Sequence, residues 1–429
     1  MKYKFIFYRV ICVIVLSHLS PLSHAYDFEV DGNYYTVLST SERTARFDGT
    51  QLSGDLTIPE TITVAGKTLT IVEIKGGAFK NNTEIQSVTI PQTITNLGED
   101  AMREGLFSKV ILPENMVSIG NYAFYNCTNL KDIHLPLQLK ELGKYAFYGC
   151  TNLESIDFPK NLHSLNYGCF ANSGLSLLYI PSNITSIKDF YRELRCFQGC
   201  KLESVVFEDA STPISITGVL RSSSSINLKG EFDKNDSIDY VYIGRNIETT
   251  CRYEPSVLIG RPDFSSATTI IWGDLCTSMS VTVEDGYPRY PYRVVASVEC
   301  RKVETIIFGK NLETIAPFDE CKKIKKIYVR ASTPQPAVAF AHDTYLHSTL
   351  YVPKGTLKAY QEADVWKEFW NIEEYDVPES PTDIKPVSVQ KDKALIGIYD
   401  INGIKHETPI KGLNIYRYKD GRAKKNFVK

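Results

Sequence analysis

The chain repeats one short segment several times between residues 119 and 181. The first copy, Ile119–Pro136, has the sequence IGNYAFYNCTNLKDIHLP, and Leu142–Pro159 follows as LGKYAFYGCTNLESIDFP. A looser third copy, Leu165–Pro181, has the sequence LNYGCFANSGLSLLYIP. A fixed period of this length is typical of a solenoid, in which each supersecondary unit stacks on the one before it. The repeat therefore predicts a solenoid rather than a globular domain with one central core.

Prolines mark the same point in successive units. They are 22 or 23 residues apart and stand at Pro91, Pro113, Pro136, Pro159 and Pro181. Because proline cannot donate a ladder hydrogen bond, each one is expected to end a short strand. We expect a turn, an Ile-Gly or Leu-Gly bend and a helical turn to follow each strand. The predicted fold class is therefore a mixed α/β repeat solenoid.

An Ala-Phe pair recurs at one point of the unit, as Ala78-Phe79, Ala123-Phe124 and Ala146-Phe147. Phenylalanine is large enough to fill the space between the strand layer and the helical layer, and alanine lets the turn pack closely. The pattern predicts that Phe124 and Phe147 occupy equivalent places. It also predicts that the strands containing Ile133 and Ile156 lie side by side in parallel.

These residues resemble the BspA-like leucine-rich repeat, a family of roughly 23-residue repeats found in bacterial surface proteins. The match to the pattern I-G-x-x-A-F-x-x-C-x-x-L-x-x-I-x-I-P is close in Ile119–Pro159, recognisable over Val72–Phe207 and patchy to Pro353. The resemblance implies a right-handed horseshoe or rod with a parallel sheet on one face. It also implies binding rather than catalysis.

The first 25 residues have the pattern of a signal peptide. Lys2, Lys4 and Arg9 give a basic start, Val10–Leu16 is apolar, and Ser23-His24-Ala25 is a small-x-small cleavage site. No later segment reaches about 18 consecutive apolar residues. We therefore expect an exported mature chain without a transmembrane span, located at the cell surface or outside the cell.

The remaining chain divides into four further parts. Alternating apolar residues around Asp31-Gly32 predict a β-rich N-terminal cap, because the end of a solenoid exposes an apolar cross-section. Near the other end, Leu357, Tyr360, Val365, Trp366 and Phe369 fit one side of a short helix pair, and Trp366 and Trp370 are expected to cover the last coil. The predicted parts are a cap at 26–66, a solenoid at 67–375, a Pro-rich linker at 376–386 and a small antiparallel β module at 387–429.

The period breaks down between residues 208 and 303. Strand-like fragments persist at Tyr240–Gly244 and Thr269–Gly273, but the intervals between strands grow longer. Insertions in repeat proteins form loops on one face, which is often the functional face. Sequence drift in a tolerant region explains the irregularity equally well.

The C-terminal module carries two strong hairpin signals, Asn402-Gly403 and Asp420-Gly421. They predict a meander of the segments starting at Leu395, Ile404, Leu413 and Lys424. From Pro381 onward there are 11 basic and 5 acidic residues, a net charge of +6. The module resembles the C-terminal sorting domains by which some anaerobic bacteria attach exported proteins outside the outer membrane. A small β module without a sorting role is the alternative.

Nine cysteines remain after cleavage of the signal peptide. Four stand three residues after a phenylalanine, at Cys127, Cys150, Cys200 and Cys321. This recurring position favours small buried side chains over a disulfide framework, although cysteines of adjacent coils could be close enough to bridge.

The sequence contains no recognisable catalytic or metal-binding constellation. His342 and His347 are five residues apart and do not match a helical zinc pair. The segment Asp233-x-Asn235-x-Ser237 begins like a calcium loop, but Ile238 stands where glycine is needed. No cofactor, metal site or enzyme activity is predicted; an enzyme or scaffold with a site in 208–303 is a remote alternative.

Two columns of side chains are candidate ligand surfaces. Outward positions of successive strands form the first column: Thr89, Ile111, His134, Asp157, Tyr179, Val206, Tyr242, Ile271, Ile307, Tyr328 and Tyr351. Within it, the candidate ligand face is Tyr179, Tyr242, Ile271, Ile307, Tyr328 and Tyr351. A second ladder, Tyr122, Tyr145 and Tyr167, precedes the Ala-Phe position. Tyrosine suits protein and sugar ligands, but the same residues also stabilise neighbouring strands by packing alone.

The sequence therefore favours a surface-displayed binding protein, active in adhesion or protein recognition through the strand face. A glycan-binding module for polysaccharide capture is the alternative. The partner in either case is a protein or glycan on host or neighbouring cells. The 48 basic and 50 acidic residues give a net charge of −2, which offers no electrostatic case for nucleic acid.

Overall fold

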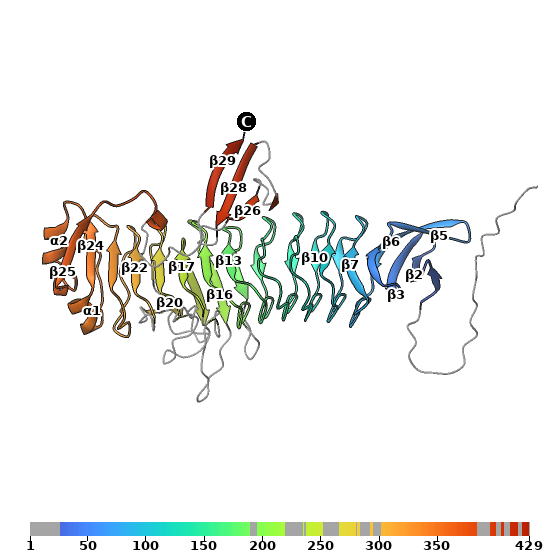
Figure 1. Cartoon of the computed structure of the whole chain (residues 1–429), viewed down its shortest axis with the longest axis horizontal. Coiled ribbons are helices and arrows are strands. Elements are labelled where there is room, and N and C mark those ends of the chain that lie inside the picture. Colours follow the sequence, from blue (N-terminus) through green and yellow to red (C-terminus); the bar gives the residue numbers. More distant parts are fainter. Residues whose placement is uncertain are drawn as a thin grey trace, which may run out of the picture.

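The computed structural model shows an elongated rod of stacked coils (Figure 1). It describes residues 26–188, 195–218, 235, 237–251, 266–279, 281–283, 292–294, 302–383, 395–399, 405–406, 412–418 and 423–428. The predicted signal peptide lies outside these ranges. No helix in the described ranges is long and apolar enough to cross a bilayer.

A curled five-stranded mixed sheet closes the N-terminal end. Its order is β1-β2-β3-β6-β5, with β3 and β6 parallel and the other neighbours antiparallel. The strands are β1 (Phe28–Val30), β2 (Asn33–Ser39), β3 (Thr44–Thr50), β5 (Thr61–Val64) and β6 (Lys67–Ile74). The cap expected at 26–66 thus extends to Ile74, and β4 (Gly54–Thr57) leaves it to pair with the first coil.

Short parallel strands connect the regular coils that follow. One sheet has the order β4-β7-β9, with β7 at Ile85–Thr89 and β9 at Lys109–Ile111. Another has the order β11-β10-β8, with strands at Glu141–Leu142, Ser118–Ile119 and Asn96–Leu97. The Ile133 and Ile156 segments form no such ladder; near them there is only an isolated parallel bridge between Lys109 and Asp132. The expectation of paired strands there is therefore wrong.

The coils are linked instead through their Ala-Phe turns. The amide of Phe124 donates to the carbonyl of Ala146 at 2.8 Å, and the amide of Phe147 donates to that of Cys169 at 2.7 Å. These turns are hydrogen-bonded but are not helices. The expected mixed α/β character therefore gives way to a mostly stranded solenoid. The described helices are α1 (His342–His347), α2 (Leu357–Glu362), η1 (Trp366–Glu368) and η2 (Pro381–Asp383).

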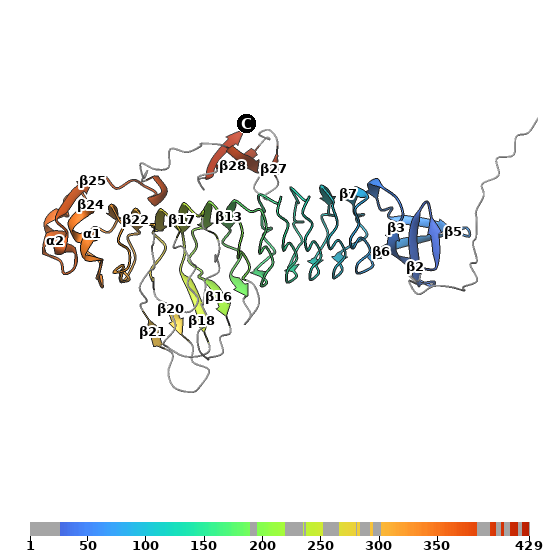
Figure 2. The same ribbon diagram turned by 60° about the horizontal axis from the view of Figure 1, so that its bottom comes forward.

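A long eight-stranded sheet follows, and it is parallel throughout. Its strands in order are β13 (Leu177–Ile180), β15 (Ser204–Phe207), β17 (Tyr240–Ile243), β19 (Thr269–Trp272), β22 (Thr305–Phe308), β23 (Lys326–Val329), β24 (Thr349–Pro353) and β25 (Asn371–Tyr375). The irregular intervals of 208–303 therefore do not break the register. The described strands among these intervals, such as β16 (Ile214–Gly218) and β18 (Ile247–Cys251), extend to one side of the rod (Figure 2).

A second sheet accommodates part of these extra residues. Its order is β12-β14-β16-β18-β20-β21. The strands are β12 (Ser164–Leu165), β14 (Ser186–Lys188), β16 (Ile214–Gly218), β18 (Ile247–Cys251), β20 (Val281–Val283) and β21 (Tyr292–Val294).

A column of aromatic rings fills the interior of the rod. The rings of Phe124 and Phe147 are stacked with centroids 5.0 Å apart, and Phe170 and Phe197 continue the stack at 5.5 and 5.7 Å. All four are fully buried. This confirms that the phenylalanine of each unit occupies the same place.

One coil fills the column differently, because Met102 stands where the other units have phenylalanine. The ring of Phe107, five residues later, packs edge-on against Phe79 with centroids 5.9 Å apart. Gly105 makes this possible, since a Cβ there would lie 1.9 Å from the Phe107 ring.

Among the residues whose side chains the structure describes, buried cysteines with reduced thiols stand at Cys127, Cys150, Cys169, Cys196, Cys200, Cys276 and Cys321. The thiol of Cys150 donates to the carbonyl of Phe124 at 3.1 Å, and that of Cys200 donates to Phe170 at 3.1 Å. Each of these two thiols therefore donates a hydrogen bond to a backbone carbonyl of the preceding coil. The prediction of buried thiols is confirmed for these residues.

The C-terminal cap is built from α2, η1 and β25. Tyr360 and Trp366 are fully buried, and the indole of Trp366 donates to the carbonyl of Gln335 at 2.6 Å. Trp370 is 79% exposed, so the expectation that it covers the last coil is wrong. Its place is taken by β25, an additional strand whose pairing turns the Trp370 side chain away from the core.

The C-terminal module is an antiparallel sheet of order β27-β26-β28-β29. Its strands are β26 (Leu395–Tyr399), β27 (Lys405–His406), β28 (Gly412–Tyr418) and β29 (Ala423–Val428). The predicted simple meander is therefore wrong, because β28 pairs with β26 while the two-residue β27 lies at the edge. Both hairpin dipeptides lie outside the described residues.

Candidate functional site

Five tyrosines pack together along the Ala-Phe turns of three coils, where Tyr145 is buried and the other four are half-buried; we name this cluster the tyrosine ladder. Tyr122 and Tyr145 stack with ring centroids 5.3 Å apart, and Tyr125 and Tyr148 stack at 4.6 Å. Tyr167 extends the ladder by an edge-on contact with Tyr145 at 5.7 Å. The structure thus brings together the predicted residues Tyr122, Tyr145 and Tyr167.

Tyr125 and Tyr148 belong to the same surface and were not predicted. The sequence carried a signal for them, since both close copies contain Ala-Phe-Tyr. Their rings reach the ladder because the turn folds Tyr125 against Tyr122, with centroids 5.8 Å apart, and Tyr148 against Tyr145 at 5.9 Å. Only the turn geometry reveals that positions three residues apart form one surface.

Two tyrosines of the ladder adopt a backbone conformation that disfavours their side chains. Tyr122 and Tyr145 each have φ of +55°, in the left-handed region. The equivalent residue of other coils is Gly77, Asp100 or Gly168, with φ of +75°, +56° and +64°. A bulky residue in this region costs on the order of 1–3 kcal/mol. These coils therefore carry tyrosine where glycine would be less strained.

Two cations lie beside the rings. The guanidinium carbon of Arg103 is 4.7 Å from the Tyr125 ring centroid, and the ammonium of Lys144 is 5.9 Å from that of Tyr122. Cation–π contacts of this length hold the side chains in place. Arg103 also bonds Asp100 at 3.2 Å, so the cation is fixed from both sides.

The second candidate surface is the outward column of the eight-stranded sheet. The register places Tyr179 beside Val206, then Tyr242, Ile271, Ile307, Tyr328 and Tyr351 in that order. At the far end, Tyr328 and Tyr351 stack with centroids 4.4 Å apart, and Tyr375 packs edge-on against Tyr328. The strand alignment inferred from the sequence is therefore present.

The column is not exposed along its whole length. Ile271 and Ile307 are fully buried, and Tyr242 is only 5% exposed. On β15, β17, β19 and β22 both faces are buried, whereas β13 and β23 alternate as a half-exposed strand does. The expectation of an exposed face is wrong for these three residues, which pack with Val206 and Tyr240 in one buried cluster. In addition, η2 of the same chain lies against β19.

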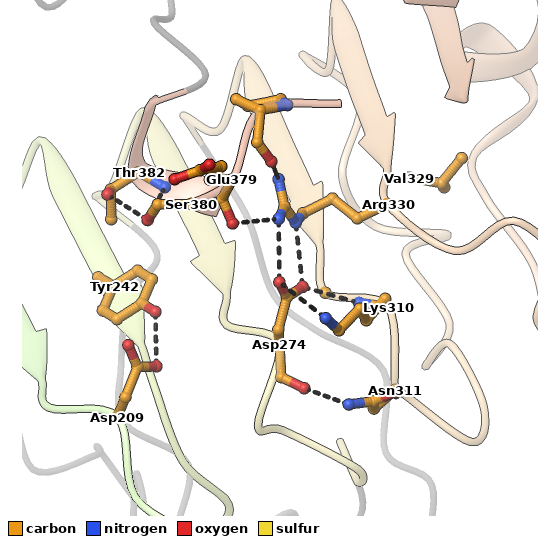
Figure 3. A network of polar contacts seen from close by, with 12 residues as sticks. Asp209, Tyr242, Asp274, Lys310, Asn311, Val329, Arg330, Glu379, Ser380 and Thr382 are labelled. Atoms are coloured by element: carbon orange, nitrogen blue, oxygen red, sulfur yellow. Dashed lines mark hydrogen bonds and ion pairs between the residues drawn. The ribbon is translucent and has the colours of Figure 1, made fainter. Parts of the chain in front are cut away.

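A network of polar groups borders the buried part of the column (Figure 3). The guanidinium of Arg330 donates to both carboxylate oxygens of Asp274, at 3.0 and 2.9 Å. It also donates to the carbonyls of Pro378 at 2.9 Å and Glu379 at 3.1 Å. Arg330 thus connects the strand ends to a segment that the sequence predicts to be a linker.

A tyrosine–carboxylate pair lies nearby. The hydroxyl of Tyr242 donates to Asp209 Oδ1 at 2.6 Å. Burial, aided by this hydrogen bond, raises the pKa of Tyr242, and burial also raises the pKa of Asp209. For Asp274, burial would raise the pKa, but the hydrogen bonds from Arg330 and from the Lys310 amide outweigh it and hold the pKa below its usual value.

Glycines make room for this network. The residue that ends each strand is proline in the regular coils, but Gly244, Gly273 and Gly309 follow β17, β19 and β22. A Cβ on Gly273 would lie 2.6 Å from the Tyr242 hydroxyl, and one on Gly309 would lie 2.2 Å from the Gly273 carbonyl. The change from proline to glycine at this position is a sequence signal for the polar network. The prediction from the sequence did not include it.

Comparison with known proteins gives a family for the repeats. The BspA type leucine rich repeat region matches in six copies, over residues 46–136 and 72–202. No curated protein matches the sequence.

Solved structures similar to this chain cover most of it at low identity. A leucine rich cell surface protein from Faecalibacterium prausnitzii is 16% identical with a TM-score of 0.41, covering 82% of this chain and 95% of its own. A leucine-rich repeat protein from Bacteroides ovatus is 17% identical with a TM-score of 0.28, covering 82% and 100%. The pneumococcal vaccine antigen PcpA is 17% identical with a TM-score of 0.39, covering 82% and 98%.

The repeat match lies on the coils whose phenylalanines form the interior stack, from Phe47 through Phe79 and Phe124 to Phe197. Sequence pattern and packing thus describe the same unit. Residues 46–202 of this chain are BspA-type leucine-rich repeats.

Proposed function

We propose that this chain is an exported, surface-displayed protein that binds a protein ligand through the tyrosine ladder. Export is supported by the signal-peptide pattern of residues 1–25, and binding rather than catalysis by what the family implies. Attachment outside the cell through the basic C-terminal module belongs to the same proposal.

The observation that carries the proposal is the left-handed backbone of Tyr122 and Tyr145. Residues held in costly conformations cluster at functional sites, because surrounding packing must maintain them. Glycine at these two positions would fold with less strain, as Gly77 and Gly168 do. For the half-buried Tyr122, the proposal accounts for the tyrosine by contact of its side chain with a ligand, and the buried Tyr145 supports that ring from behind.

The ladder favours a protein ligand over a glycan. Sugar rings stack on the faces of aromatic side chains. In the ladder the faces of Tyr122 and Tyr145, and those of Tyr125 and Tyr148, are turned toward each other. Tyrosine also carries a hydroxyl group beside its apolar ring, which suits the mixed apolar and polar surface of a protein.

The strand face is a second candidate surface for a protein ligand. Tyr179, Tyr328 and Tyr351 are partly exposed and flank the buried stretch, and the stacked pair Tyr328–Tyr351 offers a rigid anchor. Tyr242, Ile271 and Ile307 reach a ligand only when the covering segment moves.

The experiment compares two sets of substitutions in the full chain. Binding is measured by surface plasmon resonance to immobilised extracellular-matrix proteins and to a glycan array. We expect Tyr122→Gly with Tyr125→Ala to weaken protein binding at least 10-fold, while Tyr328→Ala with Tyr351→Ala tests the strand face. Glycan hits without protein binding, or a ladder variant with unchanged affinity, would reject the proposed surface.

A further inference from the structure

The segment after the C-terminal cap, residues 376–383, lies along the strand face; we name it the strap. Arg330, whose side chain is only 4% exposed, holds the carbonyls of Pro378 and Glu379. Beyond them, η2 lies against β19, and its first residue, Pro381, is buried. The strap is therefore attached to the sheet at Pro378, Glu379 and Pro381, whereas the side chains of Asp376 and Val377 are exposed.

At its start the strap is held by an exposed ion pair between Asp376 and Lys354 at 2.8 Å. Its contacts with Arg330 are made by two main-chain carbonyls, which any extended peptide can supply. The hydroxyls of Ser380 and Thr382 bond each other at 2.7 Å. The sheet supplies the specific part: a guanidinium oriented by Asp274, on the same sheet as the buried apolar Ile271.

We propose that the strand face at β17, β19 and β22 is a peptide-binding site that the strap occupies in cis. An extended proline-containing peptide binds there by displacing the strap. The carbonyls of that peptide take the hydrogen bonds of Arg330, and its proline covers Ile271. This site is separate from the tyrosine ladder and does not depend on the ligand bound there.

An intramolecular occupant lowers the apparent affinity of a competitor by the fraction of molecules in which the site is open. A substitution that detaches the strap must therefore improve binding of an added peptide. A substitution of Arg330, which would hold that peptide, must weaken its binding. These two opposite effects on peptide affinity distinguish a binding site from a surface on which a segment of the chain merely packs.

The probe is a fluorescein-labelled peptide with the sequence of residues 376–386, DVPESPTDIKP, measured by fluorescence anisotropy with the full chain. We expect Pro381→Asp to tighten binding of this peptide at least 10-fold relative to the wild-type chain. Adding Arg330→Met to Pro381→Asp is expected to remove that gain. Lys325→Met, which breaks the exposed pair with Glu304 on the neighbouring strand, is the matched control and leaves binding unchanged.

Hydrogen exchange of the same proteins gives a second measurement that needs no added peptide. Amides of the strap are expected to be protected in the wild type and to exchange at least 10-fold faster in Pro381→Asp, while peptides from β22 and β23 keep their protection. Equal peptide binding by wild type and Pro381→Asp, no binding by either, or an unprotected strap in the wild type would overturn the proposal.

Discussion

The rings of Phe124 and Phe147 lie parallel, at an interplanar angle of 3° with centroids 5.0 Å apart. This is the offset that stacked coils impose on equivalent side chains, since adjacent strands are roughly 4.8 Å apart. Each phenylalanine therefore packs against both neighbouring coils, and the stability of the rod depends on an unbroken column.

Replacing one ring in this column should be costly. We expect Phe147→Ala to reduce the free energy of unfolding by about 3–5 kcal/mol, because the substitution leaves a cavity between two coils. Urea unfolding followed by circular dichroism measures the loss. Trp370→Ala, at an exposed position, is the control and should change stability by less than about 0.5 kcal/mol. A Phe147→Ala loss below about 1 kcal/mol would contradict the packing account.

The bend glycines should tolerate substitution unequally. A Cβ on Gly143 would lie 2.4 Å from the Asn121 amide nitrogen, whereas on the equivalent Gly98 the nearest atom would be 3.5 Å away. Gly143→Ala must push two coils apart, and overpacking of this kind typically costs about 1–3 kcal/mol. Gly98→Ala should cost clearly less. Thermal unfolding of both variants tests this, and equal losses would show that the coils do not meet at Gly143.

Tyr122→Gly should separate stability from binding. The substitution removes a stacked ring, but it also relieves a left-handed backbone that costs on the order of 1–3 kcal/mol in tyrosine. We expect the net change in unfolding free energy to be below about 1 kcal/mol. Urea denaturation compares the unfolding free energies of Tyr122→Gly and Tyr125→Ala. The second substitution relieves no such strain. A larger loss in Tyr122→Gly than in Tyr125→Ala would remove the strain argument.

The buried thiols should resist alkylation in the folded chain. Burial raises the pKa of Cys127 to about 12 and that of Cys276 to about 12, so both remain neutral at pH 8.5. Because the thiolate is the nucleophile, iodoacetamide should leave both residues unmodified until denaturant is added. Mass spectrometry of the digested protein locates the modified cysteines. Modification of Cys127 at the denatured rate would mean that its coil opens readily.

The Asp274–Arg330 pair predicts a dependence of stability on pH. The pKa of Asp274 is lower in the folded chain than in the unfolded one, because the hydrogen bonds from Arg330 and Lys310 outweigh burial. Its stabilising contribution is therefore complete above the unfolded pKa of about 3.9 and is lost as pH falls below that value. We expect Asp274→Asn to cost about 3 kcal/mol at pH 7, since it leaves a buried guanidinium unpaired.

The measurement is urea unfolding of wild type and Asp274→Asn at pH 7, 5 and 3. Their difference in unfolding free energy should shrink below pH 4. Asp209→Asn serves as the comparison, because the pKa of Asp209 is shifted in the opposite direction. Its pKa is raised in the folded chain, so folding favours the protonated carboxyl group. A wild-type advantage over Asp274→Asn that is constant down to pH 3 would contradict the assignment.

The period of the sequence determined the stacking of the coils, because it is a local pattern that each unit repeats. Phenylalanine and cysteine recur at fixed points, so their common burial follows from one copy. The same logic placed Tyr242, Ile271 and Ile307 in one register across irregular intervals. In each case the neighbour along the rod has the same position in the next unit.

Tertiary structure alone decided which of these residues face solvent. Ile271 points outward from its strand yet is buried, and η2, more than a hundred residues later in the chain, lies against that strand. The left-handed backbone of Tyr122 and the replacement of a missing ring by Phe107 likewise depend on neighbouring coils. A repeat pattern carries no information about such contacts, since they join positions that the period does not relate.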